Sequence, residues 1–63
     1  MKKYFAVGDY GPLGDQSISR NFFASSPEAV RIMFKGYVIR NYGEYTWDKM
    51  GYRNVSIYEG WMK

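Results

Sequence analysis

Aromatic side chains dominate the apolar content of this chain, which has 63 residues and contains neither cysteine nor histidine. Phenylalanine, tyrosine and tryptophan together make up 21% of the residues. Chains of this size bury only about 60% of their unfolded surface, so they usually need disulfides, a metal or self-association for stability. Without cysteine and histidine, disulfides and thiolate or imidazole zinc sites are excluded. The composition therefore predicts one small domain, residues 1–63, supported by aromatic packing or by self-association.

The charges are mixed and evenly spread. Nine basic and six acidic residues give a net charge of +3, and no block of like charge indicates a nucleic-acid footprint. No apolar stretch is long enough to span a membrane. Lys2 and Lys3 resemble the start of a signal peptide, but the apolar run over residues 4–7 is too short for one. We therefore expect a cytoplasmic protein with no membrane contact, no cofactor and no metal.

The first third of the chain predicts an antiparallel hairpin. Residues 3–7 are aromatic and β-branched and indicate a strand. Residues 8–15 contain three glycines and a proline, which favour a loop. Residues 17–24 indicate a second strand, with Ile18, Phe22 and Ala24 on one face. Arg20 shares that face, so we expect it near a sheet edge.

Ser26 and Pro27 mark the start of a helix, because serine is a good N-cap and proline suits the first helical position. The helix then ends at Gly36, with a strand over residues 37–41, or it continues through Gly36 to about Arg40, where the glycine would allow close approach to the sheet. We favour the longer helix, because nine residues make a short one. The spacing places Val30 and Met33 toward the sheet and Phe34 on the flank.

The last third of the chain predicts one more strand. Residues 44–50 show no clear period and are expected to be irregular. Residues 54–59 alternate strictly, which places Val55 and Ile57 inward and Tyr58 outward. The predicted fold class is α+β: a small single domain of β-β-α-β order, with one helix packed on a three-stranded antiparallel sheet.

The residue types argue against catalysis. The five serines lack a histidine base, and the six carboxylates are scattered. A body of this size is also expected to be too small for a substrate pocket of several hundred Å³. We therefore expect a protein that is not an enzyme.

Tyrosine, tryptophan, phenylalanine and methionine are the residues that protein interfaces favour. The sequence therefore predicts non-catalytic protein binding through an aromatic surface, with Trp61-Met62 as a possible extension and a homo-oligomer as one arrangement. The alternative is that the loops cover these rings. The candidate partner-binding residues are Phe34, Tyr45, Trp47, Tyr58 and Trp61.

Nucleic-acid binding is the second hypothesis. Basic and aromatic residues interleave between residues 40 and 53, and exposed rings beside cations can stack single-stranded bases. Glu44 and Asp48 lie in the same stretch and oppose a polyanion. The residues concerned are Arg40, Tyr42, Tyr45, Trp47, Lys49, Tyr52 and Arg53.

Short tyrosine-rich chains that lack cysteine and any catalytic motif are typical of bacteriophage accessory proteins. Some proteins of that type inhibit host enzymes or host defence systems, as anti-CRISPR proteins do. This association by type suggests an inhibitor as one form of the protein-binding role.

Overall fold

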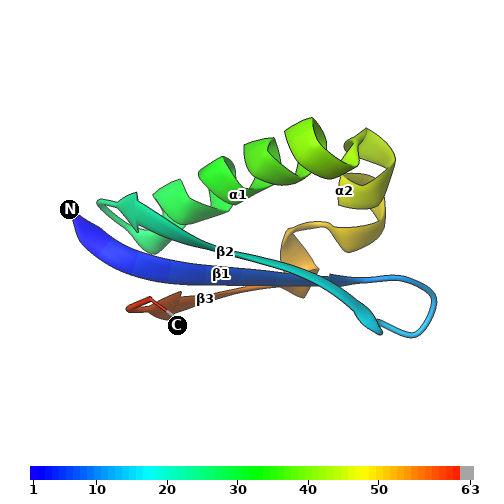
Figure 1. The fold of residues 1–63 in the computed structure, drawn as a ribbon, viewed down its shortest axis with the longest axis horizontal. Coiled ribbons are helices and arrows are strands. Elements are labelled where there is room, and N and C mark those ends of the chain that lie inside the picture. The colour runs from blue at the N-terminus through cyan, green and yellow to red at the C-terminus, as the bar shows by residue number, and fades with distance from the viewer. Residues whose placement is uncertain (62–63) are drawn as a thin grey trace.

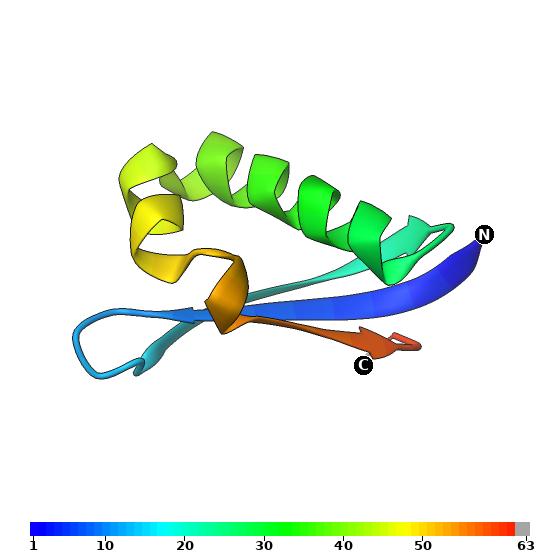
Figure 2. The same cartoon turned by 180° about the vertical axis from the view of Figure 1, so that it is seen from behind.

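Three antiparallel strands and two helices make up the computed structural model, which describes residues 1–61 (Figure 1). The strand order is β2-β1-β3, so the first strand is central. Both helices lie on one face of the sheet, and the view from behind shows the same two layers (Figure 2). In chain order the elements are β1 (Lys2–Tyr10), β2 (Gln16–Ala24), α1 (Pro27–Tyr42), α2 (Glu44–Met50), a 3-10 turn η1 (Tyr52–Asn54) and β3 (Val55–Glu59).

The predicted hairpin is present, but its first strand is longer than expected. β1 and β2 pair antiparallel from Lys2 opposite Ala24 to Tyr10 opposite Gln16. Gly8 therefore lies inside β1 and does not end it. A Cβ at this position would overlap the Met50 Sδ and come within 3.0 Å of the Phe34 ring. Glycine is needed here because α2 packs directly on the strand backbone.

One face of the sheet carries the core. Side chains alternate along a strand, so every second residue of β1 points to the helices. Val55 is buried and Ile57 is half-buried on that face, as the alternation in the sequence predicts, while Tyr58 is exposed on the other. The sheet's other core residues on the helix side are Tyr4, Ala6, Ile18, Phe22 and Ala24.

Helix α1 begins as predicted and is long. The Ala29 N–H donates to the Ser26 Oγ at 3.3 Å, and Pro27 occupies the first turn. The helix passes through Gly36, which confirms the longer alternative. A Cβ on Gly36 would meet no atom within 4 Å, so this glycine does not serve a close approach to the sheet.

The buried side of α1 differs from the predicted one. Val30, Phe34 and Val38, spaced four residues apart, are fully buried, whereas Met33 is 42% exposed. Phe34 therefore lies in the core and not on the helix flank, and its ring meets that of Phe22 edge-on at 6.2 Å. Apolar residues cover most of the circumference of this helix, so spacing alone did not determine which side faces the sheet.

Residues 44–50 form helix α2, where an irregular segment was expected. Gly43 and Gly51, both with positive φ, bound this helix. Trp47 and Met50, three residues apart, are its buried residues. Seven residues hold too few turns for a helical period to be recognised, and tertiary packing supplies the stability of so short a helix.

The α+β class and the three-stranded antiparallel sheet are thus present, with two helices between β2 and β3 in place of one. Within residues 1–61, neither helix has the length and apolar character required to cross a membrane.

Candidate functional site

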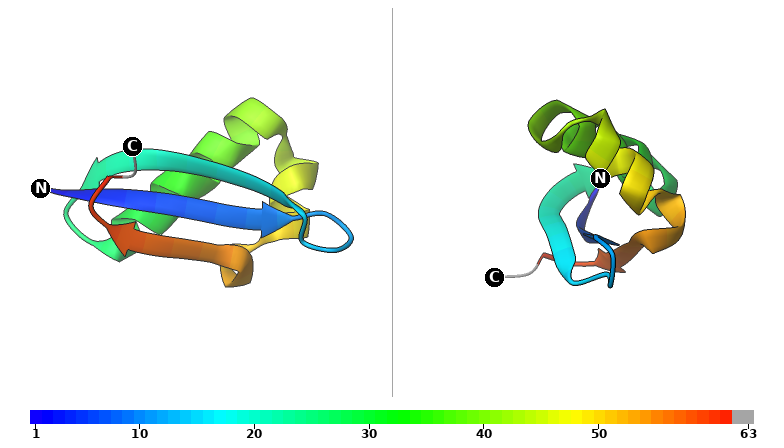
Figure 3. Two further views of the ribbon diagram at one scale, coloured as in Figure 1. Left: turned by 60° about the horizontal axis from the view of Figure 1, so that its bottom comes forward. Right: turned by 90° about the vertical axis from the view of Figure 1, so that its right-hand side faces the viewer.

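The sheet face opposite the helices is not covered by any element of residues 1–61 (Figure 3). The register of the three strands places ten side chains on this face, and Trp61 packs against it. We call this surface the open face. Its residues are Lys3, Phe5, Val7, Asp9, Ser17, Ser19, Asn21, Phe23, Ser56, Tyr58 and Trp61.

Four aromatic rings gather on the open face in two pairs. Phe5 on β1 and Tyr58 on β3 are directly opposite in the register, with ring centroids 6.4 Å apart. Phe23 on β2 and Trp61 meet edge-on at 4.7 Å. Phe23 is 48% exposed, Tyr58 56% and Trp61 43%. Three large rings thus remain about half exposed to solvent on one surface, where burial by a partner would be favourable.

Trp61 reaches the open face because the chain turns back after β3. Gly60, with φ of 99°, donates its N–H to the Lys3 carbonyl at 2.8 Å. The Trp61 indole N–H then donates to the Phe22 carbonyl at 3.0 Å, and the Lys3 Nζ lies 4.8 Å from the indole centroid. These contacts hold Trp61 on the open face, whereas Met62 lies outside the described residues.

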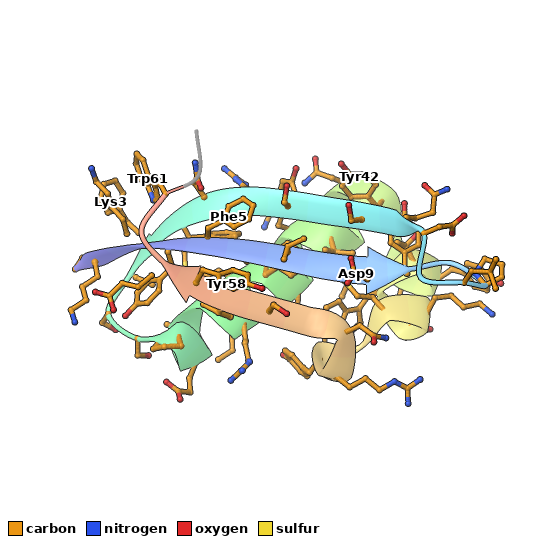
Figure 4. The ribbon with its side chains drawn as sticks, turned by 90° about the horizontal axis from the view of Figure 1, so that it is seen from below. Lys3, Phe5, Asp9, Tyr42, Tyr58 and Trp61 are labelled. Carbon is orange, nitrogen blue, oxygen red and sulfur yellow. The ribbon has the colours of Figure 1, made fainter. Side chains whose placement is uncertain are left out.

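The open face differs in character between its two ends (Figure 4). Lys3 and Trp61 lie toward one end, Asp9 lies toward the hairpin turn, and Phe5 and Tyr58 lie between them. The rings occupy the Lys3 half, while the Asp9 half carries smaller side chains, namely Val7, Ser17, Ser19 and Ser56. Among residues 1–61, Lys3 and Asp9 are the only charged residues of the open face, and their charges cancel.

The structure divides the five predicted partner-binding residues between core and surface. Phe34 is fully buried and Trp47 is 7% exposed, so neither is available to a partner in this fold. Tyr45 is exposed on α2, which lies on the helix side of the sheet and not on the open face. Tyr58 and Trp61 are brought together on the open face, and only these two share a surface.

Phe5 and Phe23 belong to the same surface but were not predicted. The signal was present in the strand alternation, since Phe22 pointing inward requires Phe23 to point outward. The same parity places Phe5 opposite to Tyr4. This alternation could identify Phe5 and Phe23 as outward-facing only once the buried face of each strand was known.

The basic and aromatic stretch between residues 40 and 53 does not form a continuous surface of rings. Trp47 is buried and meets the Tyr52 ring at 4.9 Å. The Lys35 Nζ lies 5.9 Å from both ring centroids. Tyr45 points to solvent with the Lys49 Nζ 5.3 Å from its centroid. These rings bind cations of the chain itself.

Two surface hollows exceed the size that the sequence led us to expect. One, of about 380 Å³, lies between the hairpin turn and α2 and is lined by Tyr10, Gly11, Pro12, Tyr45, Thr46 and Lys49. The other, of about 370 Å³, lies between β2 and α1. There the Arg20 guanidinium packs 4.7 Å from the Tyr37 ring centroid, and Arg20 lies on the edge strand β2, as predicted. The size argument against a substrate pocket therefore does not hold.

The acidic residues do not form a candidate metal site, since no group of three suitable side chains occurs within residues 1–61.

The phenol of Tyr42, near the end of α1, has a perturbed pKa. A side-chain hydrogen bond with Tyr37 raises the pKa of Tyr42 above its ordinary value of 10. The two rings meet edge-on at 6.1 Å, and they lie outside the open face.

Comparison with known proteins gives no match to a family model, a curated protein or a solved structure.

Proposed function

We propose that this chain is a non-catalytic binding module that docks a protein partner on its open face. The observation that carries the proposal is the placement of Phe23, Tyr58 and Trp61, each about half exposed, on the one sheet face that the helices leave uncovered. Burying a large apolar side chain contributes about 1.5–3 kcal/mol. Aromatic residues near the centre of an interface dominate its affinity.

The charge of the open face favours a protein over a nucleic acid. Nucleic-acid affinity depends on neutralising several phosphates with lysine or arginine. The open face offers Lys3 alone, and Asp9 on the same strand repels a phosphate. A protein interface needs no net charge, because apolar burial supplies its stability.

Single-stranded nucleic acid is the second candidate because of one specific arrangement. Phe5 and Tyr58 lie side by side on neighbouring strands of an uncovered antiparallel sheet. RNA-recognition sheets stack bases on aromatic residues placed in this way. The binding of a labelled oligonucleotide that weakens steeply with salt would favour this candidate.

A pair of matched variants tests the proposal. Tyr58→Ser removes a ring from the open face, and Tyr45→Ser removes an exposed ring from α2. We expect affinity capture from nuclease-treated source-cell lysate to recover a partner with the wild type and Tyr45→Ser but not with Tyr58→Ser. Thermal melts check that both variants stay folded. Equal capture by both variants would contradict the open face as the docking surface.

The nature of the partner is a further part of the proposal. The partner would be a host enzyme or a component of a host defence system, and this chain would be its bacteriophage-encoded inhibitor. The composition of the chain supports this part of the proposal. A cytoplasmic location is proposed on the same basis.

A further inference from the structure

The open face is self-complementary in both charge and size. On β1, Lys3 and Asp9 lie six residues apart on this face, with Phe5 and Val7 between them. Large rings occupy the Lys3 half and small side chains the Asp9 half. Such a surface carries opposite charges at its two ends and large side chains at only one end. It is therefore complementary in charge and in side-chain size to a second copy whose strands run in the opposite direction.

We propose that the open face docks a second copy of this chain, face to face and with the strands of the two sheets running in opposite directions. The inference rests on the proposed function, since it names a second copy, in place of a host protein, as the partner of the same surface. The dimer would be a four-layer sandwich, with two sheets packed about 10 Å apart and the helices outside.

A two-fold axis between the sheets, perpendicular to the strands, generates this arrangement. On β1 the axis passes over Ala6, midway between Lys3 and Asp9. The register partners of Ala6 are Arg20 on β2 and Ile57 on β3. The same axis is therefore centred on all three strands.

The axis sets which residues meet. Lys3 faces Asp9 of the second copy, and Phe5 faces Val7 of the second copy. Each edge strand faces its own counterpart, so Phe23 lies over Ser17 of the second copy, and Tyr58 lies over Ser56. Every open-face ring on a strand is thus placed against a smaller side chain, and both charged residues find an opposite charge.

The other two-fold arrangement is disfavoured by charge. An axis parallel to the strands would place Lys3 against Lys3 and Asp9 against Asp9, and like charges in an interface cost affinity. It would also place the ring-bearing half of one open face against the ring-bearing half of the other. The antiparallel arrangement avoids both conflicts and is isologous, as closed dimers are.

The size of the domain favours a second copy as well. The chain packs its core on one side of the sheet only, and within residues 1–61 it has neither a disulfide nor a metal cluster to support it. Small domains of this kind gain stability by oligomerisation. A second sheet would bury the four rings and give the sheet a core on both faces.

Charge exchange tests the contact between Lys3 and Asp9. Sedimentation equilibrium is measured for the wild type, Lys3→Glu, Asp9→Lys, the double variant and an equimolar mixture of the two single variants. We expect each single variant to weaken the dimer about 10- to 100-fold, because two ion pairs become two repulsions by symmetry. The double variant and the mixture restore opposite charges at both contacts, so both should dimerise like the wild type.

A matched control separates this contact from a general effect of charge. Lys49→Glu makes the same substitution on α2 and, like Lys3→Glu, removes a lysine from an aromatic ring. It should leave the dimer unchanged. Restored dimerisation in the mixture also proves that both single variants are folded.

Three results would overturn the proposal. The wild type could stay monomeric at about 1 mM, which is the weak end of the affinity scale. The wild-type dimer could be insensitive to both single substitutions, or the mixture of the two single variants could stay monomeric. The wild type could be monomeric and still capture a protein that Tyr58→Ser does not capture. That result would support the proposed function with a partner other than a second copy. If neither measurement depends on the open face, both proposals fail.

Discussion

Gly8 provides the sharpest test of how the helices pack on the sheet. An added Cβ would overlap the Met50 Sδ, lie 2.8 Å from its Cε and lie 3.0 Å from the Phe34 Cε2. Both side chains are fully buried, so the flexible end of Met50 can move aside only by displacing its neighbours in the core. Gly8→Ala should therefore destabilise the fold, although alanine is the better residue in most strands.

The magnitude follows from two opposing effects. Overpacking a core costs about 1–3 kcal/mol, and replacing glycine within a strand by alanine returns roughly 0.5–1 kcal/mol. We expect a net loss centred on about 1 kcal/mol in the free energy of unfolding. For a domain of this size, that loss lowers the melting temperature by roughly 4–8 °C.

Thermal unfolding followed by circular dichroism measures this change. A double-mutant cycle with Met50→Val, which removes both atoms of Met50 that meet the new Cβ, assigns the loss to that contact. In the Met50→Val background, Gly8→Ala should cost much less than in the wild type. A Gly8→Ala variant that melts at or above the wild-type temperature would refute the direct packing of α2 on β1.

Two further predictions concern α1. Gly36→Ala should raise the free energy of unfolding by about 0.5–1 kcal/mol, because alanine is the better helix former and its Cβ would meet no atom within 4 Å; a lower melting temperature would contradict this. Because the pKa of Tyr42 is raised, the folded state favours the neutral phenol, and this contribution is present below pH 10 and lost as the pH rises through and above 10. In an NMR titration of the Tyr42 ring, Tyr37→Phe should lower that pKa, and an unchanged midpoint would show that the hydrogen bond is not its cause.

Local signals predicted the elements whose determinants lie within a few residues. Ser26 and Pro27 marked the start of α1, and the alternation around Val55 and Ile57 gave the inward side of β3. Gly8 and α2 were missed for a shared reason. Gly8 continues β1 because it pairs with Ile18 on β2 and with Val55 on β3, and Met50, 42 positions away in the chain, packs on it.

The candidate site was harder to predict than the fold. In a chain with this many aromatic residues, composition cannot separate rings of the core from rings of the surface. Phe34 and Trp47 are buried and Phe5 and Phe23 face outward because of which sheet face the helices cover. Tyr58 was placed correctly because β3 alternates strictly between apolar and polar residues.

The two tryptophans occupy different environments and give the chain two separate fluorescent reporters. Trp47 lies in the core and is 7% exposed, whereas Trp61 lies on the open face and is 43% exposed. Loss of the fold would transfer the Trp47 indole from apolar surroundings to water, while an occupant of the open face would change the surroundings of Trp61 and leave Trp47 as it was. Emission from the intrinsic residues thus distinguishes unfolding from docking without any added label.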